Sequence, residues 1–191
     1  LLVELVASHV LALPTAMCEH CPMLQSVEIP LVEVIGDDAF AYCKGLERII
    51  FPPMLHQLGG NTFICCETLL RVDLASTSVN SVPFAAFFGC AGLQTLELPH
   101  KLVEICDRAF GRCLSLASVT PPATLQHIGT EAFYGCTSLV TLIVFRPPPP
   151  PPPATAEAGP APAVLTVGSY AFDNCPNLKR VSAPDQVVAA L

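Results

Sequence analysis

Basic residues are scarce in this chain of 191 residues. Nine Lys and Arg stand against 16 Asp and Glu, which gives a formal net charge of −7. Proteins that bind nucleic acid draw their affinity from dense Lys and Arg, so this balance argues against a nucleic-acid partner. Charged residues make up only 13% of the chain, whereas 52% of its residues are hydrophobic. The composition therefore favours a body with a large apolar interior.

Long apolar runs and catalytic motifs are also missing. No stretch approaches the roughly 18 consecutive apolar residues of a membrane span, so we expect no membrane insertion within this segment. The apolar residues 1–13 lack a basic start, which argues against a signal peptide. No Gly-x-Ser-x-Gly elbow, phosphate loop or dinucleotide fingerprint is present. We therefore predict that the chain is not an enzyme and holds no cofactor.

What the chain does contain is a repeat, and its register is clearest on seven cysteines. These ladder cysteines are Cys21, Cys43, Cys66, Cys90, Cys113, Cys136 and Cys175. Successive separations are 22, 23, 24, 23, 23 and 39 residues. Three residues before each, except the first, stands a Phe: Phe40, Phe63, Phe87, Phe110, Phe133 and Phe172. A sustained period of this length indicates a solenoid of stacked units.

Each unit follows the pattern Ile-Gly-x-x-Ala-Phe-x-x-Cys-x-x-Leu-x-x-Ile-x-Ile-Pro, best matched by residues 35–43 and 128–136. The final alternation predicts a short strand, which the Pro closes because it cannot donate to a ladder. Phe and Cys three residues apart suit a single helical turn. One unit alone buries too little apolar surface to offset the conformational entropy that it loses on folding. Stacked units bury one another's apolar faces and so stabilise the array. We predict one array of about seven units over residues 1–191.

This pattern resembles the BspA-like class of leucine-rich repeats over nearly the whole chain. The resemblance implies a solenoid of short parallel strands, turns and single helical turns. Proteins of this class include surface-exposed adhesins, so it also implies protein binding and a cell-surface or secreted location. Pro83 and Cys106 depart from the pattern at the usual glycine position, and Cys18 takes the place of Phe in the first unit.

Both ends of the array look cut. Leu2, Leu5 and Ala7 fit the strand positions of a preceding unit, and residues 184–191 read as the start of another. An isolated solenoid needs polar capping units, and neither end carries one. We therefore expect the array to be truncated at both ends.

The ladder cysteines occupy a core position, so we expect them to be buried free thiols that behave as small hydrophobic residues. Free thiols make a cytoplasmic location equally compatible with the sequence. The pair Cys18 and Cys21, with His20 between them, suggests half of a zinc site, but no second pair completes it, and no metal site is predicted. Cys65 lies outside the ladder and is expected to point outward.

The outward residues of the strands form the first candidate binding surface. Its most varied patch comprises Arg48, Ile50, Arg71, Asp73, Thr95 and Glu97. Charge gives specificity and an exposed aliphatic residue gives contact area. We therefore predict a non-catalytic protein-binding module, adhesin-like or scaffolding, whose protein partner contacts this face. The alternative is an ordinary solvated face on which neighbouring Arg and acidic residues pair with one another.

The second candidate is a proline- and alanine-rich insertion loop, residues 146–162, within the 39-residue step. Seven consecutive prolines, residues 147–153, are expected to run as polyproline II at about 3 Å per residue. Arg146, Pro149 and Pro152 match the basic-x-x-Pro-x-x-Pro spacing that SH3-type grooves accept. The alternative function is an adaptor that displays this segment to an SH3, WW or profilin-type partner. Functionless low complexity also explains the segment.

Overall fold

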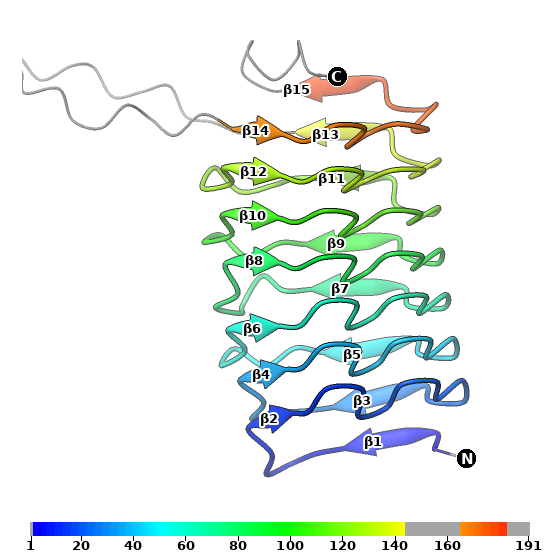
Figure 1. Ribbon diagram of the computed structural model, residues 1–191, viewed down its shortest axis with the longest axis vertical. Helices are drawn as coiled ribbons and strands as arrows, with labels where there is room; N and C mark the ends of the chain where they lie inside the picture. Colours follow the sequence, from blue (N-terminus) through cyan, green and yellow to red (C-terminus); the bar gives the residue numbers. More distant parts are fainter. Residues whose placement is uncertain (1, 144–164, 183–191) are drawn as a thin grey trace, which may run out of the picture.

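Each repeat contributes two short strands to opposite sides of a solenoid (Figure 1). The computed structural model describes residues 2–143 and 165–182. One set, called the front strands although it lies on the far side in Figure 1, comprises β1 (Glu4–Val6), β3 (Ser26–Glu28), β5 (Arg48–Ile50), β7 (Arg71–Asp73), β9 (Thr95–Glu97), β11 (Ser118–Val119), β13 (Thr141–Ile143) and β15 (Arg180–Ser182). The back strands are β2 (Ala12–Leu13), β4 (Val34–Ile35), β6 (Gln57–Leu58), β8 (Ser81–Val82), β10 (Glu104–Ile105), β12 (His127–Ile128) and β14 (Thr166–Val167).

The strand pairings are parallel and place equivalent residues of successive repeats side by side. Leu5 pairs with Val27, which confirms that the first residues occupy the strand positions of a preceding unit. The register also holds across the insertion, where Leu142 pairs with Val181. The leucine-rich-repeat solenoid with short parallel strands is therefore confirmed, and the insertion leaves the stacking of its neighbours unchanged.

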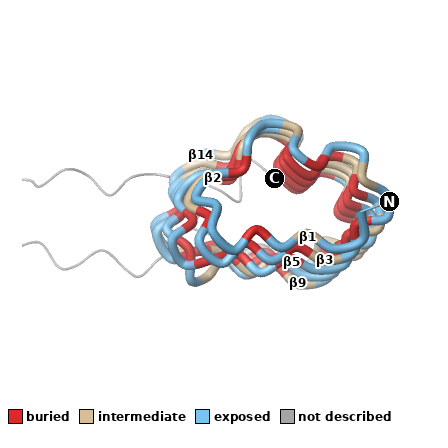
Figure 2. Tube along the Cα trace, turned by 90° about the horizontal axis from the view of Figure 1, so that it is seen from below, coloured by how far each residue is buried: buried red, intermediate tan, exposed pale blue. Residues whose placement is uncertain are grey.

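The interior consists of stacked apolar rows, and the buried positions line the inner side of every coil in Figure 2. Phe40, Phe63, Phe87, Phe110, Phe133 and Phe172 form one such row. Their ring centroids are 5.2–5.4 Å apart from one repeat to the next, and their planes are within 13° of parallel. Each ring therefore stacks on its neighbours, as expected from the repeat.

The expected single helical turn needs correction, because residues 2–143 and 165–182 contain strands and turns but no helix. Two residues in each repeat have left-handed backbones, one and five positions before the ladder cysteine, such as Asp38 and Tyr42 at φ 56° and 59°. Their N–H groups donate to the next repeat, at 2.9 Å to Gly60 and 2.8 Å to Ile64. These bonds between repeats replace helical bonds and offset the cost of the left-handed backbone.

The ladder cysteines are buried or half-buried, and all ten cysteines of the chain are free thiols. From Cys43 onward, each ladder thiol donates to the backbone carbonyl at the Phe position of the preceding repeat, over 3.0–3.4 Å. Burial raises the pKa of Cys43 and Cys136 to about 12 and also raises the pKa of Cys90. The interior thus holds neutral thiols that satisfy carbonyl groups.

Three pairings between neighbouring strands are interrupted. The sheets break between β5 and β7 and between β9 and β11 at the front, and between β6 and β8 at the back. The β5–β7 and β6–β8 breaks involve β7 and β8, the two strands within the 24-residue step from Cys66 to Cys90. Leu74 and Val82 are eight residues apart, whereas the equivalent Phe51 and Leu58 are seven apart. The extra residue lies in the turn between β7 and β8.

Candidate functional site

A hollow of about 280 Å³ opens on the front face at the break between β5 and β7. Four residues of the predicted patch line it, namely Arg48, Ile50, Arg71 and Asp73. Ile49, Phe51 and Ser76 complete the lining. The structure therefore brings together most of the residues that the sequence singled out.

Ile50 supplies the exposed apolar surface of the hollow. Its side chain is 72% exposed, more than any other large hydrophobic residue in the described part of the chain. The neighbouring Phe51 is only 4% exposed and packs edge-on against Phe63, with centroids 5.7 Å apart and planes at 88°. Alternation along the strand thus sends Phe51 inward and leaves Ile50 uncovered.

The two arginines of the hollow differ in their partners. Arg71 donates to Asp73 over 2.8 Å, and Asp73 also accepts the backbone N–H of Ala75 at 3.2 Å. The sequence left open whether neighbouring Arg and acidic residues pair with one another. Arg71 and Asp73 form such a pair. Within the described residues no carboxylate lies in ion-pair distance of Arg48. The guanidinium group of Arg48 remains available to a ligand.

Thr95 and Glu97 lie beside the hollow but do not line it. They belong to β9, where Thr95 pairs with Arg71 and Glu97 with Asp73. Of the lining residues outside the predicted patch, Ile49 and Phe51 belong to the core. Sequence reasoning missed Ser76, which follows β7 in the turn that holds the extra residue of the 24-residue step. That irregular spacing was the available signal.

The other candidate features have plain structural settings. Cys18 is buried while Cys21 is half-buried, and no group of three metal-ligating side chains gathers within residues 2–143 and 165–182. Asp37 accepts the N–H of Gly60 at 2.7 Å, so it caps a turn in the next repeat. Cys65 is half-buried at the edge of the solenoid. Arg146, Pro149 and Pro152 lie outside the described residues.

Comparison with protein families gives a match to the BspA type leucine rich repeat region, in six copies over residues 12–140 and 161–190. The chain belongs to this family. Its repeats account for the ladder cysteines, the stacked Phe side chains and the paired front strands described above. No helix in the described residues is long and apolar enough to cross a membrane.

Solved structures of bacterial leucine-rich repeat proteins share this fold. A protein from Bacteroides ovatus is 24% identical, with a TM-score of 0.59 over 93% of this chain and 54% of that chain. A protein from T. pallidum is 22% identical, with a TM-score of 0.60 over 96% of this chain and 71% of that one. One from Eubacterium ventriosum is 22% identical, with a TM-score of 0.72 over 96% and 45%.

These likenesses establish the fold of the chain. The chain spans only about half the length of the Bacteroides ovatus protein, covering 54% of it. A search of curated proteins finds no significant match.

Proposed function

We propose that this chain is a non-catalytic protein-binding module, adhesin-like or scaffolding, which recognises its partner through the front face around Arg48, Ile50, Arg71 and Asp73. The observation that carries the proposal is the hollow between β5 and β7, whose lining combines the exposed Ile50 with two arginines, Arg48 and Arg71. Repeat modules of this family generally bind rather than catalyse, and a solenoid presents its strands as one extended surface.

The chemistry of the hollow favours a particular kind of contact. Ile50 offers apolar area that has no cover within the described chain, and the alkyl parts of the arginines extend that area. Arg48 is free to pair with a carboxylate, whereas Asp73 holds Arg71 in place. The partner we expect presents an apolar side chain next to an acidic one.

Thr95 and Glu97 extend the proposed surface along β9. Glu97 stands next to Asp73 in the register, so this part of the face carries negative charge. We expect it to orient the partner by repelling acidic groups from this side, since rim charges act more on specificity and association rate than on affinity.

Site-specific cross-linking tests the proposal. A photoreactive amino acid replaces Ile50 in the hollow, and a second variant carries it at Gln57, an exposed residue of the back strand β6. In lysate of the source organism, we expect a discrete cross-linked protein with the residue at position 50 and none with the residue at position 57. The same products from both positions, or none from position 50, contradict the proposal.

A further inference from the structure

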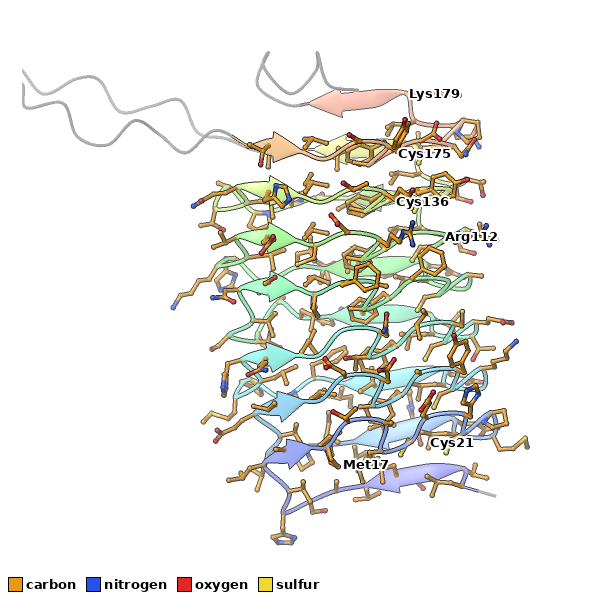
Figure 3. All side chains as sticks on the ribbon, viewed as in Figure 1. Met17, Cys21, Arg112, Cys136, Cys175 and Lys179 are labelled. Atoms are coloured by element: carbon orange, nitrogen blue, oxygen red, sulfur yellow. The ribbon has the colours of Figure 1, made fainter. Side chains whose placement is uncertain are left out.

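A groove of about 470 Å³ runs along the turn edge of the solenoid, away from the hollow on the front face. Its lining comes from successive repeats, from Cys65 and Glu67 at one end to Asn174 at the other. Arg112 marks this edge in Figure 3, far from the start of β14, where the described chain resumes after the insertion. None of its lining residues belongs to the hollow on the front face.

Glycine and large side chains alternate along the groove. Phe88 and Tyr134 occupy the same place in their repeats, two residues before the ladder cysteine, and Gly111 takes that place in the repeat between them. A Cβ atom on Gly111 would lie 2.8 Å from the ring of Phe88. The place directly before the cysteine holds Gly89 and Gly135 in the repeats that carry the aromatic residues. Two aromatic walls, Phe88 and Tyr134, therefore stand two repeats apart, and the ring of Phe88 leans over Gly111 in the repeat between them.

This spacing is close to the repeat of polyproline II. The neighbouring Phe rings are 5.4 Å apart from repeat to repeat, from Phe87 to Phe110 and on to Phe133, so two repeats span about 10.8 Å. One turn of polyproline II has three residues and spans about 9.3 Å. Every third proline of such a segment can therefore meet an aromatic wall of the groove, in the way that aromatic-lined grooves bind proline-rich segments.

The polar groups of the groove also suit a proline run, which has backbone acceptors but no N–H donors. The guanidinium carbon of Arg112 lies over the ring of Phe88, 5.9 Å from its centroid, and the N–H groups of this side chain are donors. Tyr134 adds a hydroxyl group. Both side chains line the groove.

An acidic residue at one end of the groove favours one orientation of a bound proline-rich segment. Glu67 lies at one end of the groove, and its Oε1 is 2.8 Å from Lys44. The second oxygen of Glu67 remains for Arg146, which directly precedes the prolines.

We propose that this groove binds the proline run 147–153 of a second copy of the chain, with Pro149 and Pro152 on Phe88 and Tyr134 and with Arg146 beside Glu67. The run starts only four residues after Ile143, at the end of a front strand that leads away from the groove. Four residues span at most about 14 Å, which favours a run supplied by another molecule.

The test is fluorescence anisotropy of a labelled peptide with the sequence of residues 145–154, titrated with the whole chain. We expect saturable binding that weakens at least tenfold on Tyr134→Ala and on Leu114→Asp. Leu114 lines the groove with a 43% exposed side chain, so its change leaves the core intact. The matched control is Tyr42→Ala, which removes an aromatic residue outside the groove and leaves binding unchanged. A peptide with alanine at positions 149 and 152 should bind at least tenfold more weakly.

Sedimentation equilibrium decides whether a second copy supplies the run. We expect the whole chain to associate as its concentration rises, and Leu114→Asp to shift that association to at least tenfold higher concentration. Peptide binding that ignores both groove substitutions, or equal binding of the alanine peptide, overturns the groove assignment. A chain that stays monomeric while binding the peptide overturns the second copy as the source.

Discussion

The thiol of Cys113 donates a hydrogen bond to the backbone carbonyl of Phe87 in the preceding repeat, over 3.4 Å. The same bond recurs along the ladder, for example from Cys136 to Phe110 at 3.2 Å. It links the cysteine and phenylalanine rows of the core. A cysteine at this place fills a small apolar space and also satisfies a buried carbonyl, and both roles require the protonated thiol.

The protonated ladder predicts a loss of stability at alkaline pH. The pKa of Cys136 is raised from 9.0 to about 12 by burial, so the unfolded chain ionises first. The stabilisation is complete below pH 9.0 and is lost as the pH rises toward 12. At pH 10 one such thiol lowers the free energy of unfolding by about 1.4 kcal/mol relative to neutral pH. Urea unfolding at pH 7 and pH 10 measures the loss.

The matched variant is Cys136→Ser, whose hydroxyl group can still donate to Phe110 but does not titrate in this range. We expect its loss of stability between these pH values to be smaller than that of the wild type by about 1.4 kcal/mol, because one titrating thiol is gone. All other residues are the same in both proteins, so their contributions to the pH dependence cancel. Identical pH dependence in the two proteins contradicts the account of the ladder.

Phe110→Ala removes a ring that stacks on both Phe87 and Phe133 at 5.4 Å. We expect this fully buried truncation to lower the free energy of unfolding by about 3–5 kcal/mol. Phe84→Ala is the control, because Phe84 is 49% exposed. Its truncation should lower the free energy of unfolding by less than about 1 kcal/mol. Thermal melts compare the two, and equal losses would show that the register of the repeat is misassigned.

Two neighbouring glycines give an internal comparison. A Cβ on Gly59 would lie 2.3 Å from the backbone nitrogen of Asp37 in the preceding repeat, whereas a Cβ on Gly60 would meet nothing closer than 3.5 Å. Gly59→Ala should therefore cost about 2 kcal/mol or more through backbone displacement. Gly60→Ala should be neutral or stabilise by a few tenths of a kcal/mol to about 1 kcal/mol. Urea midpoints in the opposite order would refute the packing of these coils.

The insertion should be dispensable for folding. Strand pairs on both sides of it remain in register, with His127 beside Thr166 and Thr141 beside Arg180. Removal of the 16 residues 147–162 shortens the step from 39 to 23 residues, which is the usual spacing. Circular dichroism and thermal melts should match those of the whole chain. An unfolded deletion variant would assign the insertion a structural role.

Much of the fold follows from the sequence because the repeat places one residue type at each core position. Phe110 and Cys113 could be assigned to the interior from spacing alone. The helical turn was mispredicted because a three-residue separation of Phe and Cys fits a helix and a β-turn equally, and periodicity carries no information on left-handed residues such as Asp38. The hollow beside Ile50 depends on a broken strand pairing, which the single extra residue near Ser76 indicates only weakly.

The dissociation constant of the cross-linked partner measures directly whether the front face binds a protein. The comparison uses the wild type, the double variant Arg48→Glu and Ile50→Asp, and the control Gln57→Glu on the back strand. All three changes fall on exposed side chains. We predict that the front-face variant binds at least tenfold more weakly and that the control binds like the wild type. Equal affinity in all three proteins would contradict the account.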